Sequence, residues 1–145
     1  MTSPAAPPLV RLHASCVAIA GRALLLLGPS GAGKSDLALR LIDRGATLVA
    51  DDQVELRRAG ERLFAAPPAR IAGKIEVRGL GILAMPHATD MPLALLIDLA
   101  APVERLPLEE RTRAIAGISL PVVALAPFDA SSALKAELAL AEFGR

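Results

Sequence analysis

The sequence contains no Trp, no Tyr and no Asn, and only one cysteine, Cys16. Its aromatic content is 2%, which argues against the base-stacking surfaces of single-stranded nucleic-acid binders. A single cysteine cannot form a disulfide within the chain and is typical of a reducing compartment. No apolar run approaches the ~20 residues of a membrane-spanning helix. The net charge of +1 is too small to attract nucleic acid or anionic membranes by overall electrostatics. We therefore expect a cytoplasmic protein with neither partner.

What the chain does contain is enough apolar material for one folded core. It has 145 residues, of which 53% are hydrophobic and 21% charged, and single domains commonly take ~100–200 residues. Residues 1–8 are rich in Pro and Ala and carry no basic residue, so they do not resemble a secretion signal. We expect a flexible N-terminal arm over residues 1–9 and one domain over residues 10–145.

Hydrophobic patterning in the first third of the chain predicts alternating strands and a helix. Strands are expected at Val10–Ile19, Ala23–Leu27 and Thr47–Ala50, the second of them a continuous apolar run typical of a strand buried on both faces. Apolar spacing over Ser35–Arg44 predicts a helix, and Gly45 suits a left-handed C-terminal cap. Strand, loop, helix and strand form a βαβ unit. The predicted fold is α/β: a P-loop nucleotide-binding domain with a central mixed sheet flanked by helices.

The rest of the chain predicts further strands and one closing helix. Gln53–Leu63 suggests a strand and a turn, and Leu93–Leu99 reads as a buried strand. The strand expected at Ser119–Ala126 contains Pro121, which favours an edge position. A last helix is expected from Ser131 or Ser132 to Phe143, with Leu134, Leu138 and Ala141 as its apolar stripe.

The strongest motif is a phosphate-binding loop. Gly28–Ser35 matches G-x-x-x-x-G-K-[ST] in full, directly after an apolar strand and before a helix. Glycines let backbone N–H groups turn inward around an anion, and the following helix points its positive end to the same place. Lys34 can reach the β- and γ-phosphates, and Ser35 can place a hydroxyl on Mg²⁺. The predicted phosphate-binding residues are Gly28, Pro29, Ser30, Gly31, Ala32, Gly33, Lys34 and Ser35.

Two carboxylates follow the strand that succeeds this loop and helix. Asp51 and Asp52 stand at its carboxyl end, where open α/β sheets bind ligands. Near a metal–triphosphate one carboxylate can serve Mg²⁺ and the other can act as a base for an incoming hydroxyl. The competing interpretation is a solvated turn that caps a helix.

The absence of Asn also bears on which nucleotide the chain binds. Without Asn the N-K-x-D motif that reads guanine in GTPases cannot occur, and neither can the H-R-D-x-x-x-x-N loop of eukaryotic-type protein kinases. We therefore expect ATP, with Mg²⁺, rather than GTP.

Three stretches together resemble the catalytic C-terminal domain of the bacterial HPr kinase/phosphorylase family. They are the segment 12–15 (Leu-His-Ala-Ser), the loop and helix through to Val-Ala-Asp-Asp at 49–52, and the segment 75–82 (Ile-Glu-Val-Arg-Gly-Leu-Gly-Ile). The resemblance extends over residues 10–84 and implies the compact alphaproteobacterial-type form without the family's N-terminal domain.

By this resemblance the chain is an ATP-dependent kinase that phosphorylates a serine of HPr, the carrier protein of the phosphotransferase system. Asp52 would accept the serine proton, His13 and Lys34 would line the phosphates, and Arg105 would be a catalytic arginine. Ser35 and Glu76 would hold Mg²⁺, joined by Asp51. Family members are hexamers, so the resemblance implies a homo-oligomer.

The residues alone leave other interpretations open. His13 can be structural, Glu76 and Arg105 can be solvated charges, and the family's phosphorolysis (removal of the serine phosphate by inorganic phosphate) is in question because Leu120–Leu125 replaces its basic, Gly-containing segment. A small-molecule kinase of the shikimate or nucleoside monophosphate type is one alternative. An ATP-binding regulatory module without phosphotransfer is another.

Overall fold

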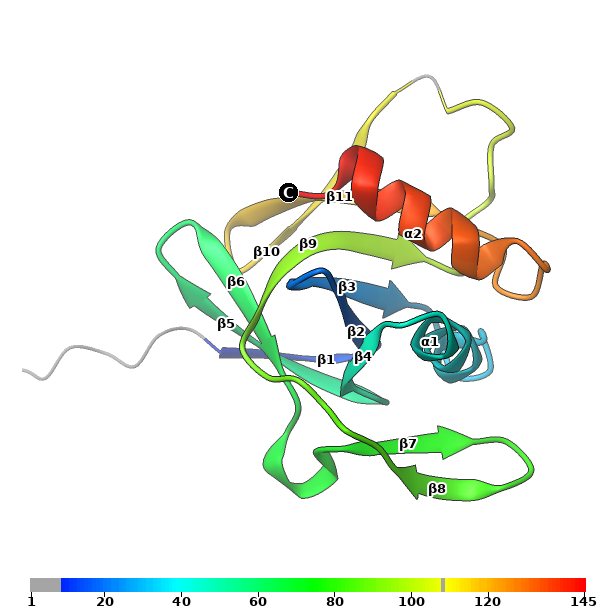
Figure 1. The fold of residues 1–145 in the computed structure, drawn as a ribbon. Helices are drawn as coiled ribbons and strands as arrows, with labels where there is room; N and C mark the ends of the chain where they lie inside the picture. Colours follow the sequence, from blue (N-terminus) through cyan, green and yellow to red (C-terminus); the bar gives the residue numbers. More distant parts are fainter. Residues whose placement is uncertain (1–8, 108) are drawn as a thin grey trace, which may run out of the picture.

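The computed structural model describes residues 9–107 and 109–145 (Figure 1). In chain order its elements are β1 (Leu9–His13), β2 (Ser15–Ile19), β3 (Arg22–Leu27), α1 (Lys34–Asp43), β4 (Thr47–Ala50), β5 (Gln53–Ala59), β6 (Arg62–Ala66), the 3-10 turn η1 (Ala69–Ile71), β7 (Lys74–Val77), β8 (Gly81–Ala84), β9 (Met91–Asp98), β10 (Arg111–Ile115), β11 (Ile118–Ala124) and α2 (Ser132–Phe143). The arm expected over residues 1–9 lies outside the described residues except for Leu9, which begins β1.

Nine strands form one mixed sheet, and β7 and β8 form a separate hairpin (Figure 1). The order is β1-β5-β6-β9-β3-β2-β4, and β11 joins β9 and carries β10. The β3–β9 and β9–β11 pairs are parallel and the remaining pairs are antiparallel. The predicted α/β fold with a mixed sheet and flanking helices is confirmed.

The central strands are buried on both faces, as the continuous apolar run of β3 predicts. Leu24 and Leu26 pack into a core that includes both helices. Leu25 and Leu27 point to the opposite core, which contains residues of β5, β6, β10 and β11. Successive side chains of a strand face opposite sides, so one strand contributes to both cores.

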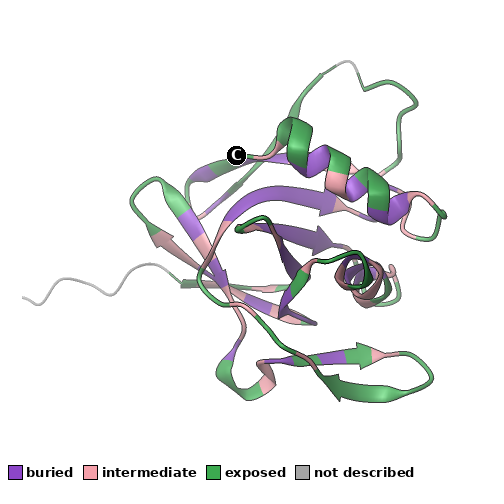
Figure 2. Ribbon diagram, viewed as in Figure 1, coloured by how far each residue is buried: buried purple, intermediate pink, exposed green. Residues whose placement is uncertain are grey.

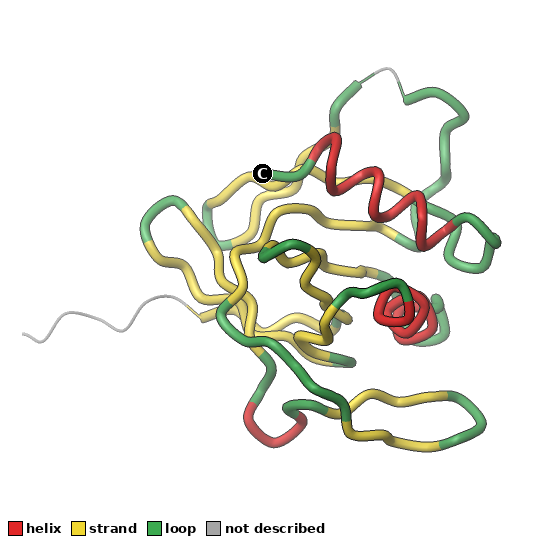
Figure 3. The backbone as a smooth tube through the Cα atoms, in the orientation of Figure 1, coloured by secondary structure: helices red, strands yellow, loops and turns green. Residues whose placement is uncertain are grey.

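The helix α1 has the predicted buried stripe, with Leu37, Ala38 and Leu41 fully buried, and Gly45 has the expected positive φ of 112°. Figure 3 shows both helices against the sheet. The strand that follows α1 is not a neighbour of β3, because β2 lies between β3 and β4. Both pair with β2 in antiparallel fashion, so they are parallel to each other, and the expected βαβ crossover skips one strand.

The strand expected at Val10–Ile19 is divided at Ala14. Its first half, β1, pairs with β5, whereas its second half, β2, pairs with β3 and β4. Ala14 marks the passage between these partners, and its backbone N–H donates to the carbonyl oxygen of Asp52 at 3.1 Å. The break therefore places the residues on either side of Ala14 next to the two aspartates.

Two expectations about the C-terminal third are wrong. β11 is not an edge strand, because it lies between β10 and β9. Its pairing with β9 begins at Val122, so Pro121 precedes the stretch that needs hydrogen bonds on both sides.

The expected apolar stripe of α2 is also wrong. Ala133, Ala136 and Ala139 face the core, whereas Leu134 and Leu138 are exposed (Figure 2). Small side chains let the helix lie close to the sheet, so Leu134 and Leu138 turn outward, while Leu140 in the last turn is buried with the alanines.

Candidate functional site

The loop between β3 and α1 is shaped for an anion. Gly33 occupies the N-cap position of α1 with φ 95° and offers no side-chain cap to the first helical turn. A Cβ at Gly33 would lie 2.8 Å from Cζ of Phe128, so a side chain there would displace the Phe128 ring and would be strained by the positive φ. A helix N-terminus with uncapped N–H groups is a ready anion site, as the motif predicts.

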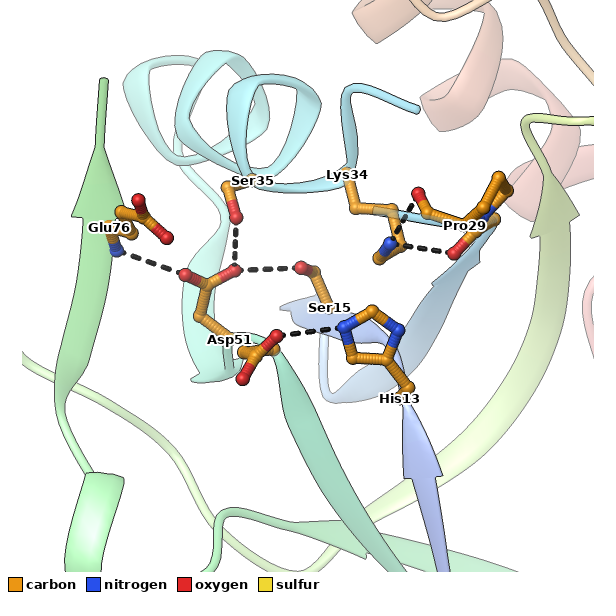
Figure 4. Close-up of polar contacts among 9 residues, drawn as sticks. His13, Ser15, Pro29, Lys34, Ser35, Asp51 and Glu76 are labelled. Carbon is orange, nitrogen blue, oxygen red and sulfur yellow. Dashed lines mark hydrogen bonds and ion pairs between the residues drawn. The ribbon is translucent and has the colours of Figure 1, made fainter. Parts of the chain in front are cut away.

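Lys34 lies folded along this loop. Its side chain is buried, and Nζ donates to the carbonyl oxygens of Gly28 at 2.6 Å and Pro29 at 2.9 Å (Figure 4). Burial lowers the pKa of Lys34 from its ordinary value, and the negative charges of Asp52 and Asp51 oppose that shift. The ammonium group is thus positioned beside the place where the loop's N–H groups would hold phosphates.

Asp51 is a buried carboxylate with three hydrogen-bond donors. Its Oδ1 accepts the hydroxyls of Ser15 at 2.7 Å and Ser35 at 2.6 Å, and its Oδ2 accepts the backbone N–H of Glu76 at 2.9 Å (Figure 4). The carboxylate thereby ties together β2, α1 and β7. Buried carboxylates need such donors, since burial without them is costly.

Asp52 turns the opposite way. Its φ of 70° is unusual for a non-glycine residue, and the N–H of Gln53 donates to the carbonyl oxygen of Asp51 at 2.8 Å, the pattern of a γ-turn centred on Asp52. The side chain is 68% exposed, and its Oδ1 lies 2.8 Å from Nε2 of His13. An ionised carboxylate only accepts, so the imidazole N–H donates and Oδ2 stays open.

One cleft of about 540 Å³ is lined by the loop, His13, Asp52, Glu76, Arg78 and Phe128. That size is ordinary for a small-molecule site. Asp51 does not line the cleft but accepts a hydrogen bond from Ser35, which does. The β7–β8 hairpin supplies Glu76 and Arg78, held in place by the bond from Glu76 to Asp51. The structure therefore brings His13, Lys34, Ser35, Asp51, Asp52 and Glu76 together.

The oxygen donors at the cleft fit Mg²⁺ shared with a triphosphate. Ser35, Asp51 and Glu76 provide a hydroxyl and two carboxylates, the hard ligands that Mg²⁺ takes. Within residues 9–107 and 109–145, no group of three His, Cys, Asp or Glu side chains forms a complete metal site. Mg²⁺ usually binds through one or two carboxylates, water and substrate phosphates, so this donor set is suited to a metal that arrives with the nucleotide.

Arg105, the predicted catalytic arginine, lies away from this cleft. It lines a different hollow, of about 800 Å³, between residues 102–105 and 109–111 on one side and α2 on the other. Sequence reasoning assigned no role to Ser15, Arg78 or Phe128, which the structure adds to the site or its walls. Phe128 could have been noticed as one of only three Phe residues, placed in the loop before the last helix.

Known proteins match the part of the chain that contains this site. Residues 6–135 match the family model described as HPr Serine kinase C-terminal domain. The chain is 49% identical over 77 residues to an HPr kinase/phosphorylase of Caldanaerobacter subterraneus subsp. tengcongensis (52% of this chain, 25% of that protein). It is 46% identical over 79 residues to that of Clostridium tetani (54% and 26%). The matched part spans about a quarter of the length of these curated relatives.

A solved structure shares the fold over nearly the whole chain. The Hpr(Ser) kinase/phosphatase from Coxiella burnetii superposes with a TM-score of 0.77 at 28% identity, covering 89% of this chain and 87% of that chain. In the part of the chain that the structure describes, neither helix is long and apolar enough to cross a membrane.

Proposed function

The chain belongs to the HPr serine kinase C-terminal domain family, and on this premise we propose that it transfers the γ-phosphoryl group of ATP to a serine hydroxyl of an HPr-like phosphocarrier protein. The observation that carries the proposal is Asp52, an exposed carboxylate held by His13 at the edge of the phosphate loop. An acceptor as large as a protein needs a base that it can reach from solvent, and Asp52 meets that need.

The proton step is assigned to Asp52. His13 donates to its Oδ1, which fixes the carboxylate plane and leaves Oδ2 to accept the proton of an incoming serine hydroxyl. The buried Asp51 cannot meet the acceptor in the same way, because three donors occupy its oxygens. The two adjacent carboxylates therefore have different roles: Asp52 faces the acceptor, and Asp51 organises the phosphate end.

Positioning and charge neutralisation supply most of the remaining catalysis in phosphoryl transfer. Lys34 would release the carbonyl oxygens of Gly28 and Pro29 and turn to the β- and γ-phosphates. Ser35, Asp51 and Glu76 would hold Mg²⁺, which neutralises charge that develops on the phosphate oxygens when bound. Arg105 is kept as a proposed catalytic arginine, and its role requires residues 99–107 and 109–110 to fold toward the cleft.

The test is transfer of label from γ-labelled ATP to the serine of a purified HPr-like protein. We expect wild type to label it, and Asp52→Asn to lower kcat by about 10²–10⁴, the usual contribution of a general base, while ATP binding persists. Asp43→Asn is the matched control, because Asp43 is exposed at the end of α1, outside the cleft. Full activity of Asp52→Asn would remove the base assignment.

The same assay separates the alternatives. Transfer to small hydroxyl compounds but not to the protein would favour a small-molecule kinase, and ATP binding without any transfer would favour a regulatory module. Adding inorganic phosphate to the labelled protein and measuring pyrophosphate tests phosphorolysis. Mass measurement in solution tests the hexamer that the resemblance implies, and cell fractionation tests the expected cytoplasmic location.

A further inference from the structure

Phe128 is an aromatic side chain exposed to solvent inside the cleft. It lies in the loop between β11 and α2, and its ring is 66% exposed although it forms one wall of the cavity. Large apolar side chains are usually buried, and an exposed one at a binding cleft is informative. In a chain with three Phe and no other aromatic residue, this placement needs a reason.

The loop that carries Phe128 is tied firmly to α1. Arg40 donates to the carbonyl oxygen of Asp129 at 3.1 Å and also to that of Pro127, and its guanidinium pairs with Asp36 at 3.0 Å. The ring itself lies against Gly33. The aromatic face is therefore held at a fixed place beside the first turn of the phosphate-binding helix.

The two ends of the cleft differ in chemistry. His13, Asp52 and Glu76 form one end, where the acceptor and the γ-phosphate belong by the proposed function. Phe128 forms another wall, and Figure 1 shows the loop before α2 and the β7–β8 hairpin on opposite sides of α1. A nucleotide whose phosphates occupy the loop with the γ-phosphate toward Asp52 must direct its base away from the carboxylates, toward the aromatic wall.

We infer that Phe128 binds the nucleotide base, with the face of its ring stacked on the purine of ATP. The inference rests on the proposed function for the ligand, ATP, and for the direction of its γ-phosphate toward Asp52. Base–aromatic stacking does not require side chains that hydrogen-bond to the edge of the base. It therefore suits a chain without the Asn that GTPases use to recognise guanine. Phe128 is thus a binding residue for the base, and the glycine loop binds the phosphates independently of it.

The test compares ATP with inorganic tripolyphosphate, which carries the phosphates without the base. Calorimetry in Mg²⁺ should show that Phe128→Ala raises the Kd of ATP at least tenfold, which is ~1.4 kcal/mol, and leaves the Kd of tripolyphosphate unchanged within twofold. Phe143→Ala is the matched control, because Phe143 is also exposed but lies on α2 outside this cleft. It should leave both constants unchanged.

A second variant reports the contact directly. Phe128→Trp would provide the only tryptophan in the chain, and its fluorescence should change on adding ATP but not on adding tripolyphosphate. Equal weakening of both ligands by Phe128→Ala would show that the ring acts only by supporting Gly33, and would overturn the inference. An unchanged ATP Kd in Phe128→Ala, or wild-type ATP binding no tighter than tripolyphosphate, would also overturn it.

These measurements need no acceptor protein, so they separate the two proposals. Tight ATP binding that depends on Phe128, without transfer to HPr, would contradict the kinase proposal and leave the base site standing. Failure of wild type to bind either ligand would overturn both.

Discussion

Replacing Ser15 by Ala tests the buried network that organises the site. Ser15 is fully buried, and its hydroxyl donates to Oδ1 of Asp51 at 2.7 Å, an oxygen that also accepts the hydroxyl of Ser35. The substitution removes one of three donors from a carboxylate that is itself only 5% exposed. Asp51 then has less hydrogen-bond compensation for its burial.

The size of the effect follows from the kind of bond removed. A hydrogen bond to a charged group contributes about 1.5–3 kcal/mol. We therefore expect Ser15→Ala to lower the free energy of unfolding by ~1.5–3 kcal/mol, which corresponds to a Tm lower by roughly 3–12 °C for a chain of this size. Because Ser15 and Ser35 share one acceptor oxygen, removing both hydroxyls leaves that oxygen without a donor. The double variant should lose at least ~0.5 kcal/mol more than the two single losses added together.

Urea unfolding followed by far-ultraviolet circular dichroism measures these differences. Ser119→Ala is the matched control, since Ser119 is exposed on β11, and its stability should stay within ~0.5 kcal/mol of wild type. A Ser15→Ala protein as stable as this control would refute the assignment of Ser15 as a donor to a charged, buried Asp51. Strict additivity with Ser35→Ala would refute the shared acceptor.

Three further predictions concern the loop and the helices. Burial lowers the pKa of Lys34 below its ordinary value of 10.5, so between the folded pKa and 10.5 the unfolded chain binds more protons and stability rises with pH. In urea unfolding, wild type should therefore gain stability relative to Lys34→Met as the pH rises toward 10.5, and the reverse trend would contradict the shift. Gly33→Ala should destabilise more than Gly21→Ala, because both residues have positive φ but only Gly33 meets an atom within 4 Å; equal losses in thermal melts would discount the clash. Ala136→Leu should cost about 1–3 kcal/mol by overpacking a fully buried position, whereas Leu138→Ala should stay within ~0.5 kcal/mol, and a larger loss at Leu138 would show that α2 is turned the other way.

Local patterns predicted most of the site because its central parts are close in sequence. Gly28–Ser35 joins β3 to α1, so its glycines, lysine and serine lie within one short stretch of chain. The aspartates follow the next strand, so their approach to Ser35 requires only the crossover of α1. Spacing alone was sufficient to place Ser35, Asp51 and Lys34 at the same end of the sheet, as observed.

Long-range packing decided what the sequence could not. Nothing in the spacing of α2 shows that alanines rather than Leu134 and Leu138 face the sheet, because both faces have helical periodicity and only the distance to the sheet selects the smaller one. Local sequence patterns also do not predict that β2 lies between β3 and β4. Only the family resemblance predicts a site role for Arg105, and the path of its segment leads it to the hollow beside α2.

The different orientations of Asp51 and Asp52 come from one backbone angle. Neighbouring residues of an extended strand point to opposite faces, but both aspartates lie past the end of β4, where that rule no longer applies. The positive φ of Asp52 and the bond from Gln53 to Asp51 reverse the chain there, so Asp51 points into the protein while Asp52 reaches His13. A left-handed conformation costs a non-glycine residue roughly 1–2 kcal/mol, and glycine would avoid that cost. The proposed role of Asp52 as the base accounts for an aspartate at this turn, because glycine would avoid the strain but would supply no carboxylate.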